Sequence, residues 1–252
     1  MTVFSSPIAH GRILQLDVSH AQATDGVIRV LTAQDIPGAN QIGTVIQDEP
    51  LLSDHELHFI GQPIALVIAE REESARQAIS RIRLQTEEWP AVFDPREAYR
   101  NKEWLAPPRC FSQGHIDQAW DECDIITQGR VDSGGQEHLY LEPQNTLAVP
   151  LEHGGIRIIS STQSPTGVQR IASRVLGLPM HRIEVDTPRL GGAFGGKEEQ
   201  ATPWAVMAAL GAYHLRRPIK LILRRDEDMR LTGKRHPYSS DFKIGLDGDG
   251  KI

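Results

Sequence analysis

The sequence predicts a mixed α/β fold in which a small α/β domain is followed by a second, larger α/β domain. Strand-like and helix-like segments alternate along the chain, as expected for this class. An irregular stretch at residues 101–112, which includes Pro107-Pro108, interrupts that alternation. A chain of 252 residues can bury the core of two ordinary domains. We therefore expect one domain over residues 1–104 and another over residues 105–252.

The first domain opens with two predicted strands. Apolar residues alternate or cluster at residues 13–18 and 26–32, and a short helix is expected between them at residues 21–23. The continuous apolar run at residues 63–69 is typical of a strand that is buried on both faces.

A helix should follow that buried strand. Small and apolar side chains recur at helical spacing within residues 71–82, and a strand is predicted at residues 84–89. The two strands and the helix between them read as a β-α-β unit. Asp94 followed by Pro95 is the pattern of an N-cap with proline in the first helical position.

The second domain continues the alternation up to the chain end. Residues 242–246 alternate as a strand, and the Asp-Gly-Asp-Gly sequence at residues 247–250 predicts a hairpin turn. Only two residues remain for a returning strand, so we expect the natural fold to continue past residue 252. The other predicted elements are helices at residues 116–119, 163–176 and 201–215, and strands at residues 125–131, 146–150, 156–160, 183–186 and 219–223.

Composition excludes several classes of protein. The formal net charge is -6 and the basic residues are scattered, which argues against a general nucleic-acid binder. No apolar run approaches the roughly 20 residues that span a bilayer, and the first residues lack the pattern of a secretory signal. We therefore expect a cytoplasmic protein without membrane contact.

The chain has only two cysteines, Cys110 and Cys123. A thiolate-bound iron–sulfur cluster needs about four cysteines, so this chain cannot hold one alone. Any redox reaction here must pass its electrons to another chain.

The most distinctive segment is the glycine-rich stretch at residues 189–198, RLGGAFGGKE. Glycine permits positive φ angles and close approach of the backbone to a ligand, although a tight turn between strand and helix would also need it. Gly191 to Lys197 fits the spacing of a phosphate-binding P-loop. The next residue is Glu198 in place of Ser or Thr, and its carboxylate would repel phosphate, so we reject that reading.

Two polar segments accompany the glycine-rich stretch. GGQEHLYLE, residues 134–142, is interpreted from pattern alone as a strand edge that faces water, with His138 as a structural histidine. The mixed charges of residues 225–229, RDEDM, with TGKRHP at residues 232–237, indicate a solvated face.

Together and in this order, these three segments resemble the molybdenum hydroxylase family of xanthine dehydrogenases and aldehyde oxidases. DEPLL at residues 48–52 and FIGQPIA at residues 59–65 resemble the small α/β hammerhead domain of that family. The resemblance implies that residues 105–252 form the first part of a molybdopterin-binding domain.

The same resemblance assigns roles to individual residues. Gln136 would hydrogen-bond an oxo ligand of molybdenum, and Phe194 and Gly195 would bring their backbone close to the metal, with Gly192 in the same cofactor-binding loop. Glu198 stands where xanthine dehydrogenases bind and orient the purine and where aldehyde oxidases tend to have an apolar residue. Ala193 departs from a third glycine found in many members. We expect Gln136 and Phe194 to approach each other beside the glycine-rich loop.

The implied reaction is hydroxylation of a purine, xanthine or hypoxanthine, with water as the source of oxygen. The implied cofactor is molybdenum–molybdopterin, with 2Fe-2S and FAD on partner chains or domains, and the protein is expected to form a hetero-oligomer. The family's general base and most pterin-binding loops lie further along than residue 252, so we expect this chain alone to be inactive. Two alternatives are an aldehyde or N-heterocycle oxidoreductase of the same family and an inert truncated product.

Overall fold

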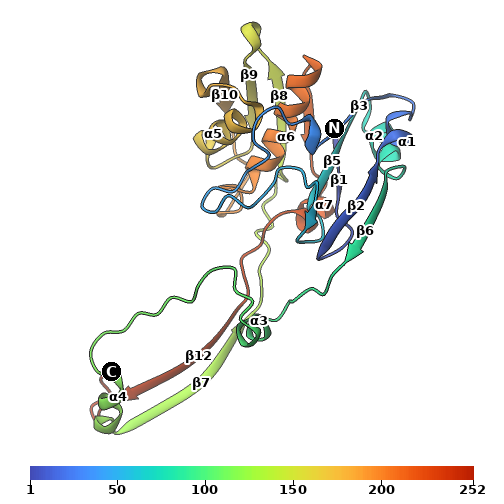
Figure 1. Cartoon of the computed structure of the whole chain (residues 1–252). Helices are drawn as coiled ribbons and strands as arrows, with labels where there is room; N and C mark the ends of the chain where they lie inside the picture. The colour runs from blue at the N-terminus through green and yellow to red at the C-terminus, as the bar shows by residue number, and fades with distance from the viewer. The chain divides into compact units, whose positions relative to one another are not determined.

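The computed structural model describes residues 1–252, which form two compact units. The first unit combines Met1–Pro90 with His138–Gly233, and the second combines Ala91–Glu137 with Lys234–Ile252. The chain therefore leaves the first unit, returns to it, and leaves it again (Figure 1). These units do not contain the same residues as the domains expected from the sequence, 1–104 and 105–252, and that domain division stays a prediction.

The N-terminal part of the first unit holds two small antiparallel sheets. Their strand orders are β1-β5-β3 and β4-β2-β6. The strands are β1 (Thr2–Ser5), β2 (Gly11–Asp17), β3 (Val27–Thr32), β4 (Glu56–Leu57), β5 (Pro63–Ala69) and β6 (Arg83–Glu88), and the helices are α1 (Ser19–Gln22), the 3-10 turn η1 (Ala33–Asp35) and α2 (Glu72–Ile79).

The predicted β-α-β unit is wrong in its pairing. Strand β5 and helix α2 are present, and five central residues of β5 are buried as expected. However, β5 lies between β1 and β3, so neither of its edges is free for the strand that follows α2. Strand β6 instead pairs antiparallel with β2 in the other sheet. The short strand β1 was not predicted.

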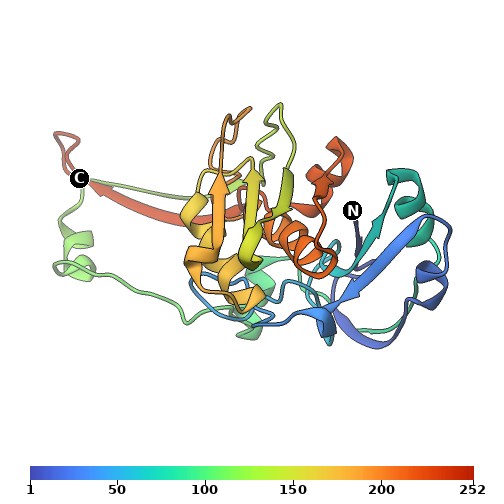
Figure 2. The same cartoon turned by 90° about the horizontal axis from the view of Figure 1, so that it is seen from above.

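The rest of the first unit is built on a four-stranded sheet of order β10-β9-β8-β11. Strands β9 and β10 run parallel, and the other neighbours are antiparallel. Helices α5 and α6 pack against each other and against this sheet (Figure 2). The elements are β8 (Asn145–Pro150), η3 (Glu152–Gly154), β9 (Ile156–Ser160), α5 (Pro165–Leu176), η4 (Met180–Arg182), β10 (Ile183–Asp186), α6 (Ala201–Leu215), β11 (Ile219–Ile222) and α7 (Arg225–Leu231).

Helix α6 lies at the centre of the main core. Most of its residues are buried on all sides, which explains its alanine-rich sequence. A Cβ at Gly211 would lie 3.0 Å from the Ile68 side chain of β5 and 3.3 Å from that of Ile219 of β11, so a larger residue here would require these side chains to shift. The predicted helices and their buried alanine faces, Ala75 and Ala78 in α2 and the alanines of α6, are confirmed.

The second unit contains α3 (Pro95–Asn101), α4 (Ile116–Ala119), η2 (Trp120–Glu122) and a ribbon of β7 (Ile125–Ser133) with β12 (Tyr238–Leu246). The predicted N-cap is confirmed, because the Asp94 carboxylate accepts hydrogen bonds from the backbone N–H groups of Arg96 and Glu97. The expectation that the last strand needs a returning strand after residue 250 as its partner is wrong. Strand β12 pairs antiparallel with β7 along its whole length, so its partner precedes it in the sequence.

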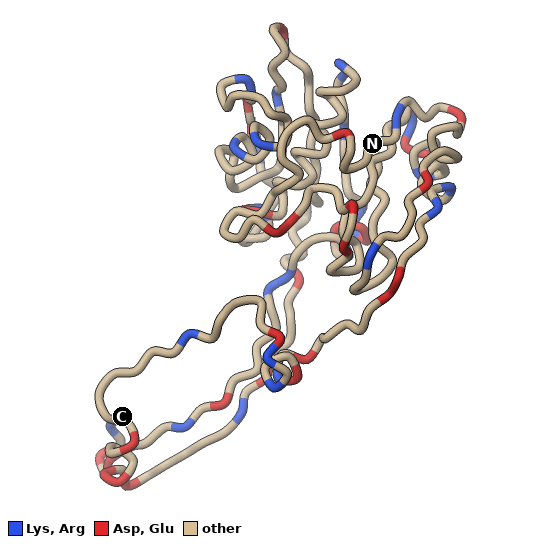
Figure 3. The backbone as a smooth tube through the Cα atoms, in the orientation of Figure 1, with Lys and Arg blue, Asp and Glu red and all other residues tan.

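Charged residues of both signs are interspersed along the backbone of each unit (Figure 3). This agrees with the scattered basic residues of the sequence. None of the helices is long and apolar enough to cross a membrane.

Candidate functional site

Parts of the three motif segments meet inside the first unit. They are His138 to Glu142, the loop at residues 187–200 between β10 and α6, and helix α7. Hydrogen bonds between side chains and backbone join each of them to at least one other.

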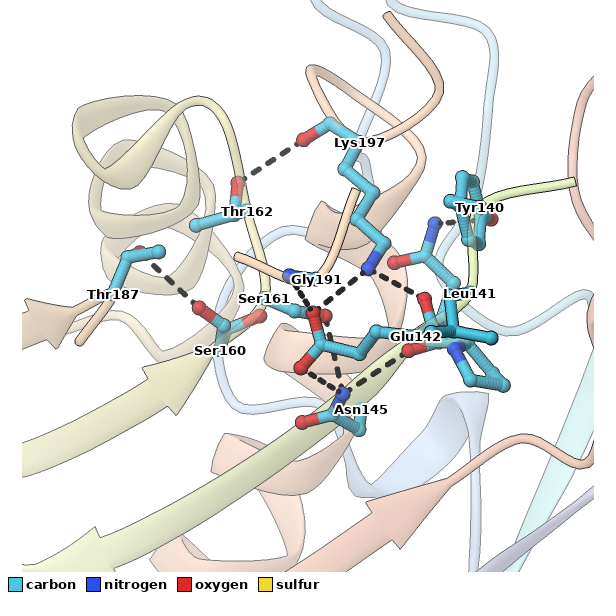
Figure 4. Close-up of polar contacts among 12 residues, drawn as sticks. Tyr140, Leu141, Glu142, Asn145, Ser160, Ser161, Thr162, Thr187, Gly191 and Lys197 are labelled. Atoms are coloured by element: carbon cyan, nitrogen blue, oxygen red, sulfur yellow. Dashed lines mark hydrogen bonds and ion pairs between the residues drawn. The ribbon is translucent and has the colours of Figure 1, made fainter. Parts of the chain in front are cut away.

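Lys197 is the link between the first segment and the loop (Figure 4). Its side chain is fully buried, and its Nζ donates to the backbone carbonyl of Glu142 at 2.7 Å and to the Glu142 carboxylate at 3.2 Å. The same carboxylate accepts from the Gly191 N–H at 2.7 Å and from the Asn145 amide at 3.0 Å. Because a P-loop lysine must reach its ligand, this buried Lys197 agrees with our rejection of a P-loop.

Burial and hydrogen bonding shift the pKa values of both Glu142 and Lys197. Burial opposes ionisation of Glu142, but the donors Gly191, Asn145 and Lys197 outweigh it, so the pKa of Glu142 lies below its ordinary value. Burial lowers the pKa of Lys197, and the carboxylate of Glu142 offsets part of that effect. The pair therefore depends on its own hydrogen bonds to stay charged.

The backbone of Lys197 is held from the other side by the turn before α5. The Gln163 N–H donates to the Lys197 carbonyl at 2.9 Å, and the Lys197 N–H donates to the Gln163 side chain at 3.2 Å. The Thr162 hydroxyl reaches the same carbonyl at 3.3 Å. The next residue, Glu198, is exposed and is thus attached to a firmly held point of the loop.

Asp228 of α7 joins the first segment to the third. It is fully buried, and its carboxylate accepts from the Tyr140 hydroxyl at 2.7 Å and from the Gln144 N–H at 2.5 Å. Burial, and then the neighbouring Asp228 carboxylate, raise the pKa of Tyr140 well above its ordinary range. The interpretation of residues 225–229 as a solvated face is therefore wrong for this residue, because composition does not reveal which side of a short helix faces the core.

Arg225 is the second residue of α7 that turns inward. One terminal nitrogen of its guanidinium donates to the carbonyls of Tyr140 at 2.6 Å and Leu141 at 2.8 Å. These two carbonyls lie outside any strand or helix, so Arg225 supplies the hydrogen bonds that a regular element would otherwise provide.

The prediction of a strand edge at residues 134–142 is also wrong. Gln136 forms only an isolated antiparallel pair with Arg235, and the residues after it are irregular. Leu139 has a φ angle of 48°, which breaks an extended strand. Tyr140 is buried at 1% exposure and His138 packs beside it, as expected for a structural histidine.

The glycine-rich loop uses its glycines where the backbone requires them. Gly192 and Gly195 have φ angles of 94° and 86°, and Phe194 has the unusual value of 53° for a residue with a side chain. A Cβ at Gly196 would lie 2.8 Å from the ring of His138, so glycine is required there by space. Ala193 is buried without a positive φ angle, so its methyl group is accommodated.

The predicted site residues are divided between the two units. Phe194, Gly195 and Glu198 lie on the loop of the first unit, and all three are exposed. Gln136 belongs to the second unit, where its side-chain oxygen accepts from Arg235 at 3.4 Å and the residue is exposed. The approach of Gln136 to Phe194 therefore stays a prediction.

Several residues that build the site were missed from the sequence. Lys197, Glu142, Asp228 and Gln144 carry no signal by themselves, since each belongs to a residue type that is normally exposed. The available clue was their position inside or beside the three motif segments.

The glycine-rich loop has the features needed for a bulky cofactor to lie close to its backbone. A Cβ at Gly195 would meet nothing within 4 Å, so the space beside this residue is free. Phe194 is 76% exposed beside it.

Comparison with known proteins agrees with this geometry. Residues 1–90 match the family model of the aldehyde oxidase and xanthine dehydrogenase a/b hammerhead domain, and residues 100–252 match that of the molybdopterin cofactor-binding domain. Among curated proteins, a xanthine dehydrogenase of Oryza sativa subsp. japonica is 40% identical over 97% of this chain. An aldehyde oxidase 2 of Cavia porcellus is 37% identical over 100% of it. The chain spans 18% and 19% of these two relatives.

Solved structures share the fold. The aldehyde oxidoreductase of Desulfovibrio gigas superimposes with a TM-score of 0.86 at 23% identity, over 98% of this chain and 29% of that one. Quinoline 2-oxidoreductase of Pseudomonas putida 86 gives 0.85 at 24% identity, over 98% and 34%. With both family models matched in order, the chain belongs to the xanthine dehydrogenase and aldehyde oxidase family of molybdenum hydroxylases and carries a molybdopterin cofactor-binding domain.

Proposed function

We propose that this chain forms part of the molybdopterin pocket of a hydroxylase that oxidises a purine, xanthine or hypoxanthine, with water as the source of oxygen. The observation that carries the purine assignment is Glu198, an exposed carboxyl on the loop that also presents Phe194 and Gly195. Relatives of both substrate types do not decide the question, because xanthine dehydrogenases and aldehyde oxidases are similar to this chain at 36–40% and 36–37% identity.

The physical argument is one of hydrogen-bond matching. A purine offers N–H donors and carbonyl or ring-nitrogen acceptors, so it can bind Glu198 in either protonation state. An aldehyde offers no comparable edge. It would leave the carboxyl without a partner once the pocket closes, at a cost of about 1–3 kcal/mol.

The chain's own residues would bind and orient rather than react. When bound, the molybdenum cofactor supplies oxygen transfer to the substrate and takes up two electrons. Gln136 would hydrogen-bond the cofactor, and Gly192, Phe194 and Gly195 would let it approach the backbone. Lys197, held by Glu142 and Gln163, keeps the neighbouring Glu198 in place.

The electrons would leave through partner chains. Two cysteines, one exposed and one partly exposed, cannot hold a 2Fe-2S cluster, so we assign 2Fe-2S and FAD to partner chains or domains of a cytoplasmic hetero-oligomer. No nucleic acid or membrane is part of this proposal.

The second candidate is an aldehyde or N-heterocycle oxidoreductase. It is favoured by the aldehyde oxidase 2 of Cavia porcellus, which matches the whole chain, and by the shared fold of an aldehyde oxidoreductase and a quinoline 2-oxidoreductase. An inert product is the third.

One assay separates the three. The complete hydroxylase that contains this chain is purified with its molybdenum, and kcat/KM is measured for xanthine, benzaldehyde and quinoline. We expect xanthine to exceed both by at least about tenfold, which is 1.36 kcal/mol. A reversed order would favour the second candidate, and no turnover of any substrate by the molybdenum-loaded protein would favour the third.

A further inference from the structure

A short buried step divides the exposed part of the glycine-rich loop. Gly195 precedes this step and Glu198 follows it, and both are exposed, whereas Gly196 and Lys197 between them are buried. The peptide that joins Gly196 to Lys197 is planar, so its orientation sets the direction of the chain on either side. Whatever holds this peptide therefore also places Gly195 and Glu198.

Gln144 holds the peptide by its carbonyl group. The side-chain Nε2 of Gln144 donates to the Gly196 carbonyl oxygen at 3.2 Å, and Gln144 is only 1% exposed. The N–H of the same peptide, that of Lys197, donates to the Gln163 side-chain oxygen, also at 3.2 Å. The peptide is thus held at both of its polar groups by side chains from two different segments of the chain.

The amide of Gln144 must present its nitrogen, and not its oxygen, to Gly196. Its Nε2 also donates to the Tyr140 hydroxyl oxygen at 3.1 Å, and that hydroxyl donates its own proton to the Asp228 carboxylate at 2.7 Å. Both neighbours of Nε2 are therefore acceptors, and a flipped amide would set its oxygen against them. The two bonds use both protons of the amide nitrogen, so one orientation of the Gln144 side chain is strongly favoured.

The backbone of Gln144 is also held at both of its polar groups. Its N–H donates to the second carboxylate oxygen of Asp228 at 2.5 Å, and its carbonyl accepts from the Leu223 N–H at 3.0 Å. Asp228 therefore holds Gln144 twice, directly at the backbone and through Tyr140 at the amide. A side chain locked by such contacts can keep a neighbouring group within about 0.5 Å of its place.

We propose that Gln144 is a positioning residue of the molybdopterin pocket, which holds the Gly196 carbonyl and thereby sets the placement of Gly195 and Glu198. The inference rests on the proposed pocket, but it is independent of the choice between a purine and an aldehyde as substrate. Because Gln144 is buried, it acts on a bound molecule only through the loop.

The test compares Gln144→Met with Gln169→Met in the complete molybdenum-loaded hydroxylase. Methionine is similar in length to glutamine but donates no hydrogen bond. Gln169 also uses its Nε2 for two hydrogen bonds, to the carbonyls of Met180 at 3.1 Å and Ile183 at 2.8 Å, which lie outside the glycine-rich loop. Gln169→Met therefore removes a similar pair of bonds from the same unit and serves as the matched control.

Two measurements are made on each variant. Hydrogen–deuterium exchange, followed by mass spectrometry of peptides that cover residues 190–199, reports on the loop without depending on any substrate. The constants kcat and KM are measured with the substrate that has the highest kcat/KM in the wild type. For Gln144→Met we expect loop exchange about tenfold faster and kcat/KM about tenfold lower, with KM raised and the molybdenum content unchanged. Gln169→Met should change none of these.

The rise in KM separates positioning from simple destabilisation, because a smaller folded fraction lowers kcat and leaves KM unchanged. Tyr140→Phe keeps Gln144 and removes only the hydroxyl that orients its amide. It should give a smaller change of the same kind, and it carries the test if Gln144→Met does not fold.

Unchanged loop exchange, an unchanged KM, or an equal effect in Gln169→Met would each overturn the proposal. Failure of the proposed function gives a different result, namely a molybdenum-loaded wild type without turnover of any substrate. The exchange measurement would then still decide whether Gln144 holds the loop.

Discussion

Asp228→Ala should destabilise the first unit far more than its place in a charged run suggests. The substitution removes a buried carboxylate and leaves the Gln144 N–H and the Tyr140 hydroxyl without their acceptor. Hydrogen bonds to a charged group contribute about 1.5–3 kcal/mol each, so the two short ones, at 2.5 and 2.7 Å, are worth about 3–6 kcal/mol. A loss of this size is a large part of the stability of an ordinary domain.

Urea unfolding followed by circular dichroism measures the effect, with Asp226→Ala as the matched control. Asp226 lies in the same helix two residues earlier but is exposed, so its loss should cost no more than about 0.5 kcal/mol. Tyr140→Phe, which removes only one of the two donors, should fall between them. If Asp228→Ala and Asp226→Ala unfold at the same urea concentration, the buried network does not contribute as argued.

Three further outcomes are expected. In the complete enzyme, Glu198→Val should lower kcat/KM for xanthine by about tenfold or more while aldehyde turnover holds or rises, and an equal loss for both substrates would make Glu198 structural. Because the pKa of Glu142 is lower in the folded state, its contribution is present above the ordinary pKa and is lost as pH falls. The urea midpoints of the wild type and Glu142→Gln should therefore differ most above about pH 5 and converge in acid, and a constant difference would contradict this. Arg76→Met, which breaks a largely buried pair with Glu227 between α2 and α7, should cost about 1–2 kcal/mol, against less than 1 kcal/mol for the exposed Arg12→Met.

Local patterns predicted the elements of this protein but not their partners. The helices α2, α5 and α6 follow from apolar spacing, and Asp94 with Pro95 marked the start of α3, because these signals act within a few residues. Strand pairing is a long-range property. The assignment of β6 to β2 depends on β1 occupying the edge of β5, and the pairing of β12 with β7 joins residues more than a hundred positions apart.

The candidate site was predicted unevenly for the same reason. The glycine-rich loop could be found because positive φ angles at Gly192 and Gly195 demand glycine in the sequence itself. Asp228 could not, because a carboxylate in a charged run is usually solvated. Its burial depends on Tyr140 and Gln144, which are remote in sequence.

The amino-acid sequence was enough to predict the class of fold, the glycine-rich loop and the resemblance to the molybdenum hydroxylases. Each of these predictions depends only on residue types and on their spacing over short stretches of the chain. The burial of Lys197 against Glu142 and the inward position of Asp228 and Arg225 on α7 became visible only in the folded chain. Burial is a property of everything packed around a side chain, and it therefore becomes fixed only when segments distant in the chain come together.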